Sequence, residues 1–161
     1  MLEVVDAVCA VWDGGSRVGI RLAPVTPHTG NTPLDSDVMA TYGYLISQLN
    51  RFNLAYLHFV EGATTMSRDV PAGISLGKLR ALFEGPYMAN NLYTRELALT
   101  ARRNGTAELI CFGRPFIGNP DLVERLKTAA PLAVAARETW YGGDAQGYTD
   151  WPTLEESATK S

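Results

Sequence analysis

The stretch "PYMANNLYTRELALTARRNGTAELICFG" (Pro86 to Gly113) decides the fold. It opens with the short apolar segment "PYMANN", which has the length and composition of a buried strand. The segment "YTRELALTARRNG" follows as a helix, with Thr94 as its N-cap and Asn104-Gly105 as its stop. The segment "AELICFG" is apolar and β-like again. A strand, a helix and a strand in this order predict two parallel strands joined by a right-handed crossover.

The same alternation covers most of the chain, so we predict an α/β fold with a parallel sheet. The expected strands are Arg17 to Pro24, Leu54 to Glu61, Pro86 to Asn91 and Ala107 to Gly113. The expected helices are Leu2 to Trp12, Asp37 to Phe52, Ser75 to Gly85, Tyr93 to Gly105 and Asp121 to Thr128. Asp35 or Ser36 is the expected cap of the second helix. The tail from Ala129 to Ser161 shows no clear periodicity.

Two parallel folds fit this order of elements. One is an open doubly wound sheet, and the other is half of a (β/α)8 barrel, which needs about 250 residues when complete. The loops after the first two predicted strands are long, while the turns that lead into strands are short. Function resides at the C-terminal ends of the strands in both folds. The residues expected at these ends are Arg21, Glu61, Asn90, Asn91, Gly113 and Arg114.

The composition is that of one ordinary globular domain. With 46% apolar and 19% charged residues, the 161-residue chain is not of the disordered class. A net charge of −3 argues against a nucleic-acid partner, and no apolar run approaches the roughly 20 residues of a membrane span. The start "MLEVVDAVCAVW" is unlike a signal peptide, so Cys9 and Cys111 are expected as buried free thiols in a reducing cytoplasm. His28 and His58 are too isolated to suggest a metal site.

Polar groups follow the last two predicted strands directly. Gly113 lets backbone approach a ligand, and Arg114 can clamp a phosphate with two parallel hydrogen bonds. The alternative is a salt-bridged surface arginine after an ordinary turn. Asn90-Asn91 likewise closes a strand and opens a helix. If these are the last two strands of a barrel, the two loops together form its phosphate site.

Two further features leave alternatives open. Arg21 lies inside the apolar strand "VGIRLAP", where it either pairs with a carboxylate such as Glu61 or lies beside a ligand that develops negative charge. The segment "TWYGGDAQGYTDWP" (Thr139 to Pro152) is either a packed C-terminal clamp or the lining of a site's mouth. No catalytic acid and no Ser/His/Asp, Walker or GxGxxG pattern is identifiable.

Five segments taken together resemble the C-terminal half of the old yellow enzyme family of FMN-dependent ene reductases. They are "VGIRLAP", "LAYLHFVE", "MANNLYTRE", "FGRPFIGNPDLVERL" and "TWYGGDAQGYTDWPTL", and they span almost the whole chain. The resemblance implies half of a (β/α)8 barrel over residues 1–161, with strands five to eight and 129–161 as its tail. It also implies that NAD(P)H reduces bound FMN, whose N5 then delivers hydride to an activated C=C bond.

The resemblance assigns site residues as well. Arg21 matches the arginine near the flavin pyrimidine edge, and Gly113 and Arg114 match the strand-eight phosphate clamp. Asn91 and Leu92 match the loop whose backbone N–H groups bind the FMN phosphate. Leu92 stands where the family commonly has glycine, so a positive φ there would be strained. The implied substrate-binding residues are Trp140 and Tyr141, where phenylalanine is the usual first member.

The family's remaining machinery belongs to strands one to four. It comprises the substrate-anchoring His/Asn or His/His pair, the tyrosine proton donor and the residues at the flavin ring edge. We therefore expect no catalytic residue in this chain and a separate N-terminal half-barrel chain that completes it, because four parallel strands alone leave open edges. The alternative is a non-catalytic half-barrel that self-associates and binds FMN or phosphate.

Overall fold

The computed structural model describes residues 1–26, 34–62, 67–141 and 144–159. The isolated histidine His28 lies outside the described residues. The chain forms two compact units, Met1–Cys111 and Phe112–Ser161, and each is described by itself. The expectation of a single half-barrel over residues 1–161 stays a prediction.

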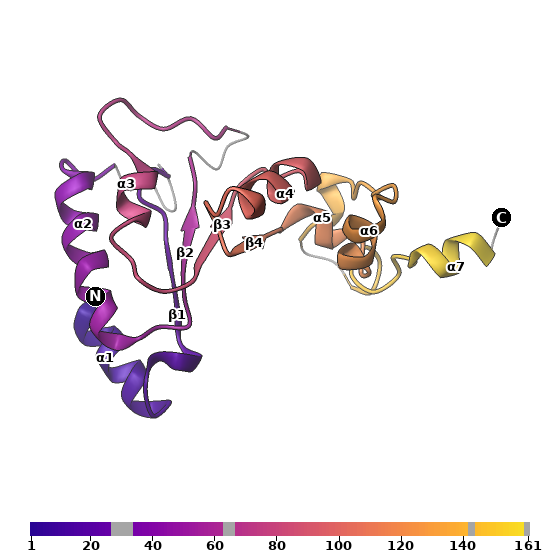
Figure 1. Cartoon of the computed structure of the whole chain (residues 1–161). Coiled ribbons are helices and arrows are strands. Elements are labelled where there is room, and N and C mark those ends of the chain that lie inside the picture. Colours follow the sequence, from indigo (N-terminus) through magenta and orange to yellow (C-terminus); the bar gives the residue numbers. More distant parts are fainter. Residues whose placement is uncertain (27–33, 63–66, 142–143, 160–161) are drawn as a thin grey trace. The chain divides into compact units, whose positions relative to one another are not determined.

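The first unit is a parallel sheet with helices packed against it (Figure 1). Its elements are α1 (Leu2–Val11), η1 (Gly15–Arg17), β1 (Gly19–Leu22), α2 (Val38–Leu49), η2 (Asn50–Phe52), β2 (Tyr56–Val60), α3 (Leu76–Arg80), β3 (Tyr87–Asn90), α4 (Arg95–Arg103) and β4 (Leu109–Cys111). Every predicted strand is therefore present, although each is shorter than expected. The flanking apolar residues lie outside the hydrogen-bonded ladder, which the hydrophobic pattern alone cannot delimit.

The described strands follow the order β1-β2-β3-β4, and each pairs in parallel with the next. Arg21 on β1 is the register partner of His58 on β2, and Val60 is the partner of Asn90 on β3. Because side chains alternate across a strand, these residues share one face of the sheet. We call it the inner face, and its members are Gly19, Arg21, Tyr56, His58, Val60, Met88, Asn90, Leu109 and Cys111.

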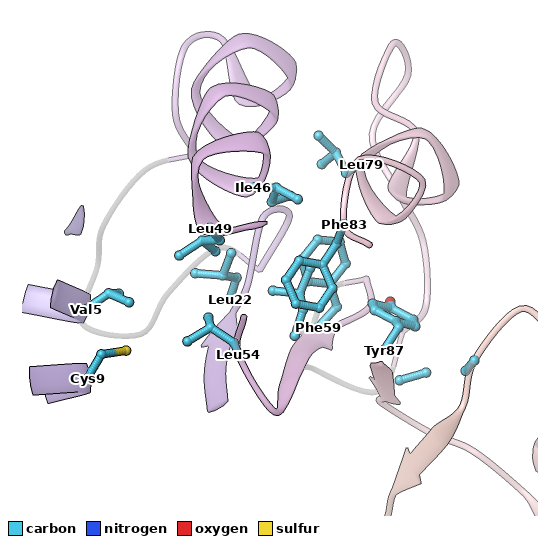
Figure 2. Packing of buried hydrophobic residues seen from close by; sticks show 13 residues of the cluster. Val5, Cys9, Leu22, Ile46, Leu49, Leu54, Phe59, Leu79, Phe83 and Tyr87 are labelled. Carbon is cyan, nitrogen blue, oxygen red and sulfur yellow. The ribbon is translucent and has the colours of Figure 1, made fainter. Parts of the chain in front are cut away.

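The opposite face of the sheet carries the hydrophobic core (Figure 2). Leu22, Phe59 and Tyr87 extend from the strands toward apolar side chains of the helices, and the rings of Phe59 and Tyr87 meet edge to face with centroids 5.3 Å apart. The helices contribute Val5 and Cys9 from α1, Ile46 and Leu49 from α2, and Leu79 from α3. Burying each large apolar side chain is worth on the order of 1.5–3 kcal/mol, which fixes the face that the helices cover.

The free thiols are partly as expected. Cys9 is buried and unpaired, and Cys111 is unpaired but half-buried. Cys111 is less buried than predicted because it lies at the end of β4 on the inner face, away from the helices.

The helix caps follow local chemistry. Thr94 caps α4 as predicted, since its hydroxyl accepts from the backbone N–H of Leu97 at 3.2 Å. The predicted cap of α2 was wrong: Asp37 holds that position and accepts from the N–H of Ala40 at 3.0 Å. Asp35 instead accepts from the N–H of Asp37, which orders the turn before the helix.

The second unit is built on short helices. They are α5 (Arg114–Ile117), α6 (Leu122–Thr128), η3 (Arg137–Thr139) and α7 (Leu154–Thr159). The helix α6 was predicted, whereas the others are too short to show periodicity. Polar side chains hold this unit together: Asn119 is fully buried and donates to the carbonyls of Pro115 and Ala133. Arg125 pairs with Asp121 at 2.6 Å and donates to the Pro152 carbonyl, which fixes the tail.

Candidate functional site

The carboxyl end of the sheet in the first unit carries several of the residues that were expected at strand ends. Arg21 lies near the end of β1, Glu61 follows β2 directly, and Asn90 ends β3. The carboxyl ends of parallel strands meet at the same edge, where barrel and doubly wound proteins bind their ligands. The structure thus confirms the predicted position of these residues at the carboxyl ends of their strands.

Arg21 does not pair with Glu61, which rules out the ion pair weighed from the sequence. The two side chains leave opposite faces of the sheet, because Glu61 continues the alternation of Leu57 and Phe59 toward the helices. Glu61 binds Arg68 instead, with 2.9 Å between Oε2 and Nη2. Among the described residues, no carboxylate lies within ion-pairing distance of Arg21. Its charge therefore stays available on the inner face.

His58 lies beside Arg21 on the same face. The residue is 7% exposed, and its Nε2 has no hydrogen-bond partner among the residues that the structure describes. Burial and, after it, the positive charge of Arg21 lower the pKa of His58 below its usual value. The imidazole is therefore neutral near pH 7, and the inner face keeps the cationic character that Arg21 provides.

The backbone turns sharply at Asn91 and Leu92, directly after β3. Both residues have positive φ, 105° at Asn91 and 52° at Leu92, so Leu92 adopts the conformation that is strained for a residue other than glycine. The buried Asn91 amide donates to the carbonyls of Glu61 at 2.6 Å and Ser67 at 2.8 Å. Within the described part of the chain, the backbone N–H groups of Leu92 and Tyr93 have no acceptor. Such a turn is suited to an anion.

Gly113 and Arg114 lie in the second unit, at the start of α5. Gly113 is the N-cap residue, and a Cβ atom added there would meet nothing within 4 Å, so the backbone is open to approach. The Arg114 guanidinium lies over the Trp140 ring, 5.7 Å from its centroid. This unit therefore brings two predicted site residues, Arg114 and Trp140, into contact.

The two predicted substrate-binding aromatics differ in their environment. Trp140 is half-buried, and its Nε1 donates to the Ala135 carbonyl at 3.0 Å. Tyr141 is 80% exposed. Further along the same segment, Trp151 donates to the Gly147 carbonyl and packs against Gly118. The packed-clamp interpretation thus describes Trp151 well, while Tyr141 is open to a ligand.

Two kinds of site are not found in the described residues. No group of three or more His, Cys, Asp and Glu side chains among them could hold a metal ion. No helix in the described ranges has the length and apolar character needed to cross a membrane.

Sequence reasoning missed Arg68, Tyr87 and Tyr93, which donate to the Glu61 carboxylate. They stand 7, 26 and 32 residues from Glu61 in the chain, so no spacing rule links them. The available signal was Glu61 itself, a charged residue at the end of a buried strand that needs partners.

A parallel α/β sheet with a cation and a left-handed turn at its carboxyl edge has its polar groups where proteins of the barrel class bind their ligands. The chain belongs to the NADH:flavin oxidoreductase / NADH oxidase family, which its residues 1–133 match. This confirms the resemblance to the old yellow enzyme family.

Individual relatives agree with the family. The 12-oxophytodienoate reductase 2 of Arabidopsis thaliana is 35% identical over 159 residues, which are 98% of this chain and 42% of that protein. The old yellow enzyme from Trypanosoma cruzi superposes with a TM-score of 0.84 at 32% identity, covering 95% of this chain and 39% of that one. Morphinone reductase in complex with tetrahydroNAD gives a TM-score of 0.82 at 40% identity, covering 97% and 40%.

The chain thus spans about two fifths of the length of these relatives. Its parallel sheet matches part of their barrel fold, which excludes the open doubly wound alternative. That its strands are numbers five to eight of the barrel stays a prediction.

Proposed function

We propose that this chain is the FMN-binding half of an NAD(P)H-dependent ene reductase that reduces activated C=C bonds. One observation carries the proposal: a single sheet edge holds both Arg21, without a carboxylate partner among the described residues, and a left-handed turn whose N–H groups at Leu92 and Tyr93 have no described acceptor. FMN carries a phosphate at one end and a ring that becomes negatively charged at the other, so it needs both features.

Each residue has a distinct role in this proposal. Arg21 would face the pyrimidine edge of the flavin and stabilise negative charge there. The turn at Asn91 and Leu92 would donate backbone hydrogen bonds to the phosphate, and in the second unit Gly113 and Arg114 would bind phosphate through open backbone and a guanidinium. Bound FMN would supply hydride transfer, from NAD(P)H to the flavin and from its N5 to the alkene.

The relatives support the donor and substrate classes. Morphinone reductase forms a complex with tetrahydroNAD, and the plant relatives are named for the reduction of 12-oxophytodienoate. For this chain we propose a nicotinamide donor and a small activated alkene, with Trp140 and Tyr141 near the substrate. Tyr141 has the exposure that such a role needs.

We also propose that strands from an N-terminal half-barrel complete the sheet. In the described sheet, β1 pairs with β2 and β4 pairs with β3, so each has one free edge. Parallel sheets are normally covered on both faces, and a barrel also closes the edges of its sheet. Here Leu109 on the inner face is 42% exposed. The additional strands would cover that face and bring the proton donor and the substrate anchor.

The test is a sequence of optical measurements on the protein as isolated. Bound FMN gives a yellow absorption band, NADPH or NADH should bleach it, and cyclohexenone should restore it. A colourless protein that takes up no added FMN would contradict the proposal.

A second candidate is a self-associating half-barrel that binds FMN or phosphate without catalysis. One observation favours it: the hydroxyls of the buried Tyr87 and the half-buried Tyr93 donate to Glu61, so neither is available as a proton donor to a substrate. Yellow protein that shows no turnover with the enone would support this candidate over the first.

A further inference from the structure

The carboxylate of Glu61 connects separate segments of the first unit. Among the described residues, its Oε1 accepts from the Tyr87 hydroxyl at 2.8 Å. Its Oε2 accepts from the Tyr93 hydroxyl at 2.8 Å and from Arg68 Nη2 at 2.9 Å. The Glu61 side chain is 16% exposed, so these are well-shielded, charge-assisted hydrogen bonds.

The same partners converge on the turn after β3. Arg68 donates through Nη1 to the carbonyl of Asn91, and its guanidinium lies 4.4 Å from the centroid of the Tyr93 ring. The backbone of Glu61 takes part as well: its N–H donates to the Asn90 carbonyl at 2.9 Å, and its carbonyl accepts from Asn91 Nδ2. Arg68 and Glu61 therefore hold the turn at Asn91, which opens it, and at Tyr93, which follows it.

This turn needs such support. Asn91 and Leu92 are consecutive non-glycine residues with positive φ, a conformation that costs free energy in both. Backbone of this kind persists when its surroundings determine it. The neighbouring Gly62 also has a positive φ, and a Cβ atom there would approach the Arg68 backbone to 2.5 Å. The backbone of Gly62 thus packs closely against the backbone of Arg68.

The hydroxyl groups keep their protons in this environment. Burial and, after it, the negative charge of Glu61 raise the pKa of Tyr87 and of Tyr93 above the usual range. Both phenols therefore act as donors to the carboxylate throughout the neutral range. Glu61 itself extends from the helix side of the sheet, opposite Arg21, so it does not reach the inner face.

We propose that Glu61 is a positioning residue for the phosphate group: through Arg68, Tyr93 and Asn91 it holds the Asn91–Leu92 turn in the left-handed conformation that presents backbone N–H groups to the anion. The proposal rests on the proposed function, in which this turn binds the FMN phosphate. It assigns to Glu61 a role in cofactor affinity without direct contact with the cofactor.

The experiment compares two ligands that differ by the phosphate. Dissociation constants for FMN and riboflavin are measured by fluorescence titration of the apo form of the full protein, as wild type and as Glu61→Gln. The amide keeps the shape but loses the charge, so it accepts more weakly from Arg68 and Tyr93. We expect FMN to bind about tenfold more weakly, with riboflavin binding unchanged.

Glu108, which directly precedes β4, provides a matched control beside the amino end of β3. It accepts from the backbone N–H of Tyr87 at 2.8 Å and pairs with Arg80, whereas the turn follows the carboxyl end of β3. Glu108→Gln should leave the ratio of the FMN and riboflavin dissociation constants unchanged. A general loss of stability would move both ligands equally in either variant.

The outcomes separate the two proposals. If Glu61→Gln does not fold, Tyr93→Phe removes one donor with less disturbance and should weaken FMN alone by roughly three- to tenfold. Equal weakening of FMN and riboflavin, or none, would overturn the role of Glu61. A wild type that binds FMN no better than riboflavin would overturn the phosphate site of the proposed function, and the inference with it.

Discussion

Arg21 and His58 are register partners on β1 and β2, and burial together with the arginine's charge lowers the pKa of the histidine. Near pH 7, therefore, only Arg21 of these two basic side chains carries a positive charge. His58 stays neutral, and the positive charge of Arg21 faces no described carboxylate. This arrangement leaves one fixed cation on the inner face, which is what a ligand with developing negative charge requires.

The lowered pKa of His58 predicts a loss of stability in acid. The unfolded chain binds a proton near the ordinary pKa of 6.5, while the folded chain resists protonation until a lower pH. Stability conferred by the neutral imidazole is thus present above pH 6.5 and is lost as the pH falls through the folded pKa. Urea unfolding as a function of pH should show this slope, and His58→Gln should flatten it. An identical slope in the variant would show that other groups cause the acid sensitivity.

Arg21→Met should slow turnover of an enone by roughly a hundredfold. Removing one well-placed group that stabilises developing charge costs about 3 kcal/mol. The flavin potential should also become more negative, because the reduced, negatively charged form loses its counter-charge. Arg17→Met is the control, since Arg17 is an exposed arginine at the amino end of β1. Equal rates in the two variants would argue against a ligand beside Arg21.

Leu92 offers a test of backbone strain. Its φ of 52° costs about 1–2 kcal/mol in a residue with a side chain, whereas glycine adopts it freely but loses more entropy on folding. Leu92→Gly should therefore keep or raise the free energy of unfolding, by up to about 1 kcal/mol. Leu92→Val should lower the free energy of unfolding by at least about 1 kcal/mol, because a β-branched residue tolerates positive φ least. Denaturant unfolding would measure both, and the reverse order would contradict the prediction.

Much of the fold could be predicted from hydrophobic pattern and caps. The individual strands, the crossover helices and the Thr94 cap are local features, so short windows of sequence contain them. The relation of Arg21 to Glu61 could not be predicted in this way. Alternation assigns faces within one strand, but the register of β1 against β2 decides which residues of different strands share a face.

The parts that were missed have physical reasons as well. The helix α5 is a single turn, too short for an amphipathic period. The Glu61 hydrogen bonds depend on three-dimensional packing between segments up to 32 residues apart. At the cap of α2, three candidate residues lie within three positions, and the choice of Asp37 depends on a turn that Asp35 itself stabilises.

Gly19 should resist enlargement because of its cross-strand neighbour. A Cβ atom at this position would lie 2.3 Å from the Tyr56 ring, so the ring must move. Gly19→Ala should lower the free energy of unfolding by about 1–3 kcal/mol, the usual cost of overpacking. Gly77→Ala is the matched control in α3, where the added atom meets nothing within 4 Å; it should raise stability by about 0.5–1 kcal/mol. Equal effects at both positions would contradict the packing argument.

The proposed completion of the barrel can be tested with two leucines of equal exposure. Leu109 is 42% exposed on the inner face at β4, and Leu82 is 41% exposed beyond α3 on the helix side. If complementary strands cover the inner face, Leu109→Asp buries a charge in the assembled protein and should shift it to a smaller particle in size-exclusion chromatography with mass determination. Leu82→Asp stays in water and should leave the mass unchanged. A wild-type chain that behaves as a stable monomer, with Leu109→Asp equally stable, would show that the inner face needs no covering partner.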